Sequence, residues 1–157
     1  MRKTTAALAA LGAAVLGVLV PTGTANAATA CDNAWHSLPA GSMAAYQHIN
    51  CGGALLGRTP GDDSNWGNGQ GAFQGSDTNR ASSVLNAGTT HDTSWHAVQF
   101  FNGTGTDWAG GSSCLKRSEF YASNLTDDYF TSGHVINDAI SSHRWVPESY
   151  CGGRFMT

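Results

Sequence analysis

A partial repeat with a fixed offset of 59 residues is the sequence feature that most constrains how this chain folds. The pairs Ser82-Ser83 and Ser141-Ser142 stand at that offset (141 − 82 = 59), and so do Ser64-Asn65 and Ser123-Asn124. The same offset aligns Asn79 with Asp138, Leu56 with Leu115, and Gly52 with Gly111. Several matches at one period indicate a duplicated structural unit.

The most polar part of the repeat is a hexapeptide near the end of each copy. The sequence Asn137-Asp138-Ala139-Ile140-Ser141-Ser142 has a partial copy in Thr78-Asn79-Arg80-Ala81-Ser82-Ser83, and each follows a long loop rich in Gly, Asn and Asp. Carboxylate, amide, hydroxyl and carbonyl oxygens are the ligands that calcium prefers. The repeat therefore favours binding of a hard cation over catalysis.

The N-terminus has the pattern of a secretory signal peptide. Arg2-Lys3 precedes an apolar run at residues 6–20, and Ala25-Asn26-Ala27 offers a small-residue cleavage site. The apolar run is shorter than the about 20 residues that a membrane-spanning helix needs. We expect residues 1–27 to be removed and the product to be secreted and extracellular, without a membrane anchor.

Charge and length exclude some partners. Removing residues 1–27 takes away two of the 8 basic residues and none of the 11 acidic ones, so the net charge moves from −3 to −5 (6 − 11 = −5). A chain without a basic patch is a poor ligand for nucleic acid. The remaining 130 residues (157 − 27 = 130) fit one compact domain, which we expect to be monomeric.

All four cysteines lie after the predicted cleavage site. An even number of cysteines in an exported chain favours two disulfides, and four cysteines allow three connectivities. Pairing within each repeat, Cys31 with Cys51 and Cys114 with Cys151, is the preferred interpretation. A zinc site is the alternative, but the sequence has no C-x-x-C or H-x-x-x-H spacing to support it.

The hydrophobic pattern predicts an all-β fold. Short segments with aromatic or apolar alternation are separated by clusters of Gly, Asn, Asp and Ser. No stretch after residue 27 keeps an apolar period of 3.6 residues over eleven residues, so long helices are not expected. The predicted strands are 42–48, 97–101, 113–116 and 143–146, with a further apolar pair at 84–85.

Two signs make each half resemble a Greek-key motif of the βγ-crystallin superfamily. One is an early hairpin with an aromatic residue followed by Gly-Gly, at residues 46–53 and, less regularly, at 101–111. The other is the calcium hexapeptide [N/D]-[N/D]-x-x-[S/T]-S, which the second copy matches fully and the first matches except at Thr78. The resemblance is to the small secreted bacterial, actinobacterial branch, which overlaps the I36 peptidase inhibitor family.

The resemblance implies two Greek-key motifs that form a disulfide-stabilised sandwich. They would occupy about residues 42–90 and 95–147 of a domain at 42–157, after an N-terminal extension at 28–41. The superfamily places the two hexapeptides side by side across a pseudo-twofold axis, where they share calcium ligands.

Carried over residue by residue, the resemblance assigns calcium ligands to both hexapeptides. Only one of these residues is a carboxylate and Arg80 adds a positive charge, so we expect a modest affinity of about 10⁻⁴–10⁻³ M. In the alternative interpretation the serines only close each motif by hydrogen bonds to the backbone. The assigned residues are Asn137, Asp138, Ala139 and Ser141 in the second copy, and Asn79, Arg80 and Ser82 in the first.

The sequence has no motif of a known catalytic class. It contains no G-x-S-x-G, H-E-x-x-H, P-loop or EF-hand pattern, so we expect no enzymatic activity. The six histidines occur singly and are expected to lie at the surface or in turns: His36, His48, His91, His96, His134 and His143.

The tryptophans allow a different interpretation. Exposed tryptophan rings can stack on sugars, which would suit a carbohydrate-binding module. Repeat alignment and hairpin position instead predict core packing for Trp66, Trp108 and Trp145, and leave Trp35 and Trp95 unassigned.

Three functions remain open at this point. The resemblance favours a secreted calcium-binding protein, which could inhibit an extracellular peptidase through a loop at 57–75 or 103–111. The alternatives on the same fold are an antimicrobial or toxin-like protein, and a module that binds carbohydrate or cell wall.

Overall fold

A computed structural model of the chain describes residues 23–89, 97–105 and 108–157. Most of the predicted signal peptide therefore lies outside the described residues. His91, Trp95 and His96, and residues 91–94 between the two predicted motifs, also lie outside them.

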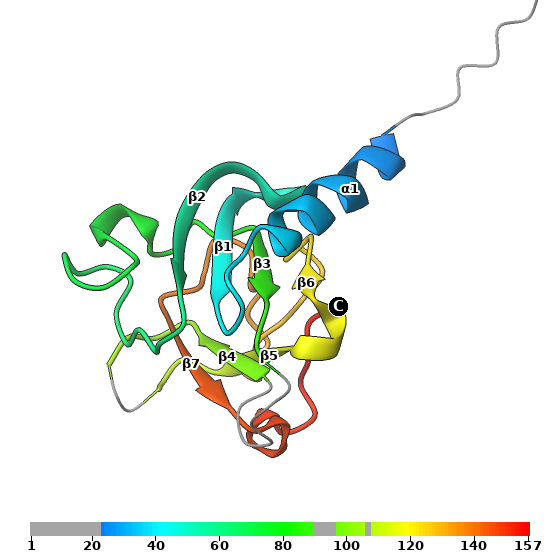
Figure 1. The fold of residues 1–157 in the computed structure, drawn as a ribbon. Helices are drawn as coiled ribbons and strands as arrows, with labels where there is room; N and C mark the ends of the chain where they lie inside the picture. The colour runs from blue at the N-terminus through cyan, green and yellow to red at the C-terminus, as the bar shows by residue number, and fades with distance from the viewer. Residues whose placement is uncertain (1–22, 90–96, 106–107) are drawn as a thin grey trace, which may run out of the picture.

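Among the described residues, seven strands form two antiparallel sheets (Figure 1). The first sheet has the order β2-β1-β3-β6 and the second has the order β5-β4-β7. The strands of the first sheet are β1 (Met43–His48), β2 (Gly52–Thr59), β3 (Ser83–Asn86) and β6 (Tyr121–Ala122). The strands of the second are β4 (Ala97–Phe101), β5 (Ser112–Lys116) and β7 (Ser142–Val146).

The predicted strands are confirmed. The segments expected at 42–48, 97–101, 113–116 and 143–146 are β1, β4, β5 and β7, and the apolar pair at 84–85 lies in β3. Three short 3₁₀ turns lie between strands, η1 (Ile49–Cys51), η2 (Gly75–Asp77) and η3 (Arg117–Glu119), and a fourth, η4 (Glu148–Cys151), follows β7.

Each half of the chain contributes a segment to the sheet of the other half. In the first sheet β6 pairs with β3, which places Ala122 opposite Val84. In the second sheet an isolated bridge places Asp63 opposite His143. These two contacts are images of each other at the offset of the repeat (122 − 63 = 59 and 143 − 84 = 59). The duplication seen in the sequence is therefore a structural pseudo-twofold.

One hydrophobic core fills the space between the two sheets. Its members come from both halves, so neither half buries its apolar face alone. The largest fully buried side chains include Trp66, Phe73, Phe100, Leu115, Leu125, Phe130, Ile136 and Ile140.

An N-terminal helix, α1 (Gly23–His36), corrects the expectation that the chain has no long helix. The segment lacks an amphipathic stripe, but it is rich in alanine, the residue with the highest helix propensity. Its C-terminal part is attached to the sandwich by contacts far apart in the sequence: the Trp35 indole N–H donates to the Asn86 carbonyl at 2.8 Å, and the Tyr121 hydroxyl donates to Asp32 at 2.9 Å. Tertiary contacts therefore hold this helix in place.

Both disulfides have the pairing preferred from the sequence. Cys31 is bonded to Cys51, with a sequence separation of 20, and Cys114 to Cys151, with a separation of 37. The first bond ties α1 to η1, and the second ties β5 to η4. Within the described residues, no helix is long and apolar enough to cross a membrane.

Candidate calcium site

The two hexapeptides lie against each other at the pseudo-twofold axis. The backbone N–H of Asn79 donates to the carbonyl of Ile140, and the N–H of Asp138 donates to the carbonyl of Ala81, both at 2.9 Å. Asn79 and Asp138 also share a left-handed backbone conformation, with φ of 56° and 53°. Asn and Asp tolerate this region better than other non-glycine residues, which explains these residue types at that place.

The side chains of the hexapeptides pair crosswise. The Ser141 hydroxyl donates to Asn79 Oδ1 at 3.0 Å, and the Ser82 hydroxyl donates to Asp138 Oδ1 at 3.4 Å. Each pair joins one residue from each hexapeptide, as the shared-ligand arrangement of the resemblance implies. A candidate site is therefore made by both halves of the chain.

The Asp138–Ser82 pair lies in a pocket of about 350 Å³. Asn137 orients its carboxylate, because the Asn137 amide Nδ2 donates to Asp138 Oδ2 at 2.8 Å. The Arg80 guanidinium donates to the Ser76 carbonyl at 3.1 Å. The residues that line the pocket are Gln47, His48, Asn79, Arg80, Ser82 and Asp138.

The geometry of this pair fits a calcium ion. A hydroxyl–carboxylate distance of 3.4 Å is longer than the about 2.5–3.0 Å of a good O–H···O hydrogen bond. Two oxygens about 2.4 Å from one calcium ion and at right angles to each other lie about 3.4 Å apart. Gln47 and Asn79, which carry side-chain amides, also line the pocket. Asn79 and Ser141 would provide neutral oxygens only.

The donor set predicts weak binding. In the part of the chain that the structure describes, no group of three or more His, Cys, Asp or Glu side chains could hold a metal ion. A cation here would depend on one carboxylate, and Arg80 lies in the same pocket. Of the other predicted ligands, Ala139 is buried at the position that corresponds to Arg80 (139 − 80 = 59).

His143 corrects the expectation that the histidines lie at the surface or in turns. It is fully buried on β7, accepts a hydrogen bond from the Trp66 indole at 2.8 Å through Nδ1, and contacts the Gly61 carbonyl at 3.0 Å through Nε2. Burial lowers its pKa to about 4, so the ring is neutral at physiological pH and carries its proton on Nε2. The offset aligns His143 with Val84 (143 − 84 = 59), which could have indicated an interior position.

The tryptophan predictions are confirmed in part. Trp66 is fully buried and Trp145 is 8% exposed, and both belong to the core. Trp108 is only partly buried and lines a surface pocket together with one edge of Trp145. The hairpin position predicted core packing for Trp108, and this prediction is wrong, because the ring packs on Phe101 at the edge of that pocket.

Two solved structures that are similar to this chain are both βγ-crystallins. No protein-family model matches this chain, and no curated protein is similar to it in sequence. The chain is similar to a βγ-crystallin from Ciona intestinalis, with 15% identity and a TM-score of 0.45, over 66% of this chain and 98% of that one. It is also similar to a βγ-crystallin from an archaeon, with 20% identity and a TM-score of 0.41, over 67% of this chain and 96% of that one.

The fold class rests on the internal geometry of this chain. Two antiparallel sheets exchange segments across a pseudo-twofold axis, two disulfides fix the ends, and the hexapeptides pair crosswise at the axis. The protein has an all-β fold of two antiparallel sheets built from a duplicated unit, as the sequence resemblance to βγ-crystallins implies.

Proposed function

We propose that this protein is a secreted, non-enzymatic, βγ-crystallin-like protein that binds calcium weakly and is stabilised by it. The observation that carries the proposal is the crosswise pair of Asp138 Oδ1 and Ser82 Oγ, 3.4 Å apart in an oxygen-rich pocket. Two disulfides and the N-terminal leader pattern support an extracellular location, where calcium is available at millimolar concentration.

Within this proposal, calcium links the two halves of the chain. Asp138 comes from the second hexapeptide and Ser82 from the first, so a bound ion would hold together segments that separate on unfolding. Binding to the native state alone adds RT ln(1 + [Ca²⁺]/Kd) to stability, about 1 kcal/mol when calcium is a few times Kd. Magnesium should substitute poorly, because it requires a tighter octahedral shell and releases its waters reluctantly.

Thermal melts in chelator, calcium and magnesium test the proposal. Millimolar calcium should raise the melting temperature by roughly 2–6 °C for a domain of this size, and magnesium should have a smaller effect. Asp138→Ala should remove most of the shift. Identical melting under the three conditions would show that the serines are structural only.

We infer a second candidate role, inhibition of an extracellular peptidase, from the long loop between β2 and β3. Three side chains of this loop accept hydrogen bonds from backbone N–H groups two residues further on: Asp63 from Asn65 at 3.0 Å, Asn65 from Gly67 at 2.9 Å, and Asn68 from Gln70 at 2.8 Å. The buried rings of Trp66 and Phe73, stacked at 3.8 Å, anchor the loop to the core. A surface loop fixed in this way loses little entropy on binding to a protease cleft.

A panel of secreted metallo-, serine and cysteine peptidases tests this second role. Stoichiometric inhibition of one class should be lost when the exposed loop residue Gln70 is changed to Ala. Thr126→Ala, in the turn that follows β6, is the matched control. Equal peptidase activity with and without the protein across the panel would exclude this role.

A further inference from the structure

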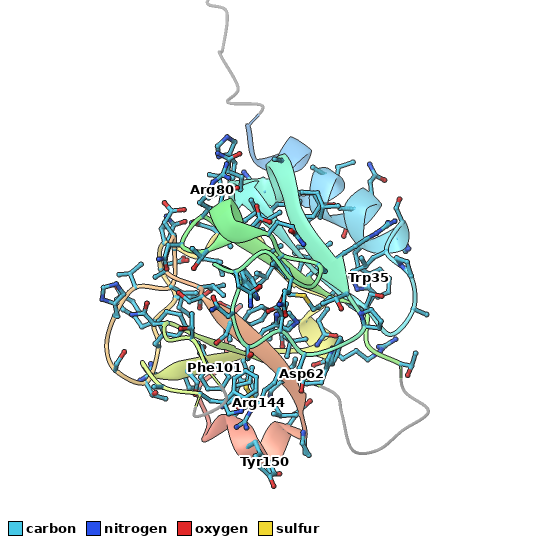
Figure 2. All side chains as sticks on the ribbon, turned by 90° about the vertical axis from the view of Figure 1, so that its left-hand side faces the viewer. Trp35, Asp62, Arg80, Phe101, Arg144 and Tyr150 are labelled. Carbon is cyan, nitrogen blue, oxygen red and sulfur yellow. A yellow bond between two sulfur atoms is a disulfide. The ribbon has the colours of Figure 1, made fainter. Side chains whose placement is uncertain are left out.

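A groove on the face formed by β7 and η4 has the composition of a ligand site. Figure 2 shows Asp62, Arg144, Phe101 and Tyr150 together on the side of the molecule that faces the viewer. A pocket of about 320 Å³ is lined there by Asp62, Trp108, Arg144, Trp145, Pro147 and Tyr150. A second pocket of about 470 Å³ shares Asp62 and Trp145 with it, so the two pockets lie next to each other on this face.

The groove presents aromatic rings on a rigid support. Tyr150 is 64% exposed and precedes Cys151, whose disulfide to Cys114 fixes it. The Trp108 ring packs on Phe101 with centroids 5.2 Å apart. Trp108 also has a φ of 54°, a conformation unusual for so bulky a residue. Strained residues of this kind occur at functional sites, where the surrounding structure holds them in place.

Two charged side chains in the groove are held in fixed positions and keep free polar atoms. Arg144 donates twice to Gln99 Oε1, at 3.0 and 2.9 Å, and its guanidinium carbon lies 5.2 Å from the Trp108 ring centroid. Asp62 accepts from the backbone N–H of Trp145 at 2.7 Å through one oxygen. The other Asp62 oxygen and Arg144 Nη1 have no hydrogen-bond partner among residues 23–89, 97–105 and 108–157.

Trp145 supplies an independent observation at the same place. The residue is only 8% exposed, it lines both pockets, and its indole Nε1 is buried without a hydrogen-bond partner among the described residues. Buried Trp N–H groups usually have a partner, because an unmet donor away from water is costly. A ligand oxygen that reaches Nε1 through the pocket wall would satisfy this donor.

We propose that this groove binds a neutral oligosaccharide. A pyranose ring has apolar C–H faces that stack on Trp108 and Tyr150, and a rim of hydroxyls that both donate and accept. Asp62 accepts from such hydroxyls, while Arg144 and the Trp145 N–H donate to them. Apolar walls with a few well-placed polar groups are typical of small-ligand sites, and the two pocket volumes lie in the usual range of about 300–1,000 Å³.

The surroundings of the groove disfavour other ligand classes. A peptide cannot extend the sheet as a strand here, because the His143 N–H is bonded to the Asp63 carbonyl and the Trp145 N–H to Asp62. A polyanion is disfavoured by the Asp62 carboxylate beside Arg144 and by the formal net charge of −3. The hydroxyls of a neutral ligand can donate to the Asp62 carboxylate and accept from the Arg144 guanidinium.

Titration calorimetry and two-dimensional NMR of the disulfide-intact protein test the proposal, with cellotetraose, chitotetraose, xylotetraose and mannotetraose as probes. At least one tetrasaccharide should bind and shift the Trp145 indole N–H signal, assigned by its loss in Trp145→Phe. Tyr150→Ala should weaken binding about tenfold, because stacking of a ring on an aromatic side chain commonly contributes that much. Asp62→Asn should weaken it by a similar factor.

Tyr129→Ala is the matched control, since Tyr129 is 45% exposed and lies outside the groove. It should leave the affinity unchanged. Asp138→Ala should also leave glycan binding unchanged, which separates this proposal from the calcium site. Failure of all four probes to bind, equal losses in the two Tyr variants, or an unshifted Trp145 signal with a bound probe would overturn the proposal.

Discussion

The two places where the halves of the chain exchange segments share one equivalent backbone pair and have different side chains. In the first sheet the crossing places Val84 against Ala122, and both are buried and apolar. In the second sheet the equivalent crossing places His143 against Asp63, and the histidine is bonded to Trp66. Duplication has thus preserved the hydrogen-bonded frame, while each half has its own interior chemistry.

The hexapeptides differ in the same way. Both pairs join a hydroxyl of one half to a side-chain oxygen of the other, but Asp138 brings a charge and Asn79 does not. The backbone is equivalent in the two halves, but the side chains differ. Equivalent mutations in the two halves should therefore change stability or calcium binding by different amounts.

Removing Trp66, the large buried aromatic residue of the first half, should cause the largest loss of stability. Trp66→Ala deletes a fully buried ring that stacks on Phe73 and bonds to His143, which should lower the free energy of unfolding by about 4–5 kcal/mol. The equivalent Leu125→Ala should cost less, about 3 kcal/mol, because no hydrogen bond is lost. Denaturant unfolding of both variants measures the difference, and equal losses would contradict it.

The two disulfides should contribute unequally. The loop closed by Cys114–Cys151 is longer than that closed by Cys31–Cys51, with separations of 37 and 20, so chain entropy predicts about 4 and 3 kcal/mol. Paired Cys→Ser variants, unfolded by denaturant, measure each contribution. Thiol titration of the denatured, unreduced protein should detect no free thiol, and a reactive thiol would show that a bridge is incomplete.

Burial of His143 at its contact with Asp63 in the second sheet should make the free energy of unfolding depend on pH. The pKa of His143 in the folded state is about 4, below its usual 6.5, because burial disfavours the charged ring. The unfolded chain therefore takes up this proton first as pH falls, and about 3 kcal/mol of stability is lost between pH 6.5 and 4. Asp128 acts in the opposite direction, because burial and the neighbouring Asp127 raise its pKa to about 6.

Protonation of Asp128 in the folded state adds stability as pH falls from about 6 to 3.8, which offsets the His143 effect. Asp128→Asn removes this stabilising effect. Melts of that variant between pH 7 and 4 should therefore show the full loss of stability that protonation of His143 in the unfolded chain causes. His143→Gln in the same background should flatten the curve again. A pH profile of Asp128→Asn as flat as that of the unchanged protein would count against this assignment.

The smallest expected effect compares the two oxygen pairs. Asn79→Asp gives the Asn79–Ser141 pair a carboxylate, so the calcium-induced rise in melting temperature should increase, by about 1 kcal/mol of added stabilisation. Asn79→Ala should reduce the rise only partly, in contrast to Asp138→Ala. Calorimetric melts with and without calcium measure all three variants. An unchanged calcium response in Asn79→Asp would show that this pair does not hold an ion.

Much of the fold could be predicted from the sequence because it depends on local patterns. The strand segments follow from apolar alternation, and the pseudo-twofold from the offset shared by the two Ser-Ser pairs. These features need only neighbouring residues or a repeated spacing, so a single chain is sufficient to reveal them. The disulfide pairing within each repeat was preferred from the sequence, but four cysteines allow three connectivities and only the structure chose among them.

Other features depend on contacts between distant segments. Helix α1 has no amphipathic stripe, and its attachment to the sandwich through Asn86 and Tyr121 cannot be seen in its own sequence. The burial of His143 depends on Trp66, which is 77 residues away. A residue that reads as polar is buried once a partner from the other half satisfies its hydrogen bonds.

The sequence by itself determined the duplicated all-β frame and the residue types of the hexapeptides. Only the tertiary structure decided that Asp138 pairs with Ser82 rather than with Ser141, and that Asp62, Arg144 and Tyr150 share one groove. The physical reason is that strand patterns and repeats are local or periodic, whereas a site is made where segments far apart in the chain meet. Which distant segments come into contact is decided by the packing of both halves into one core.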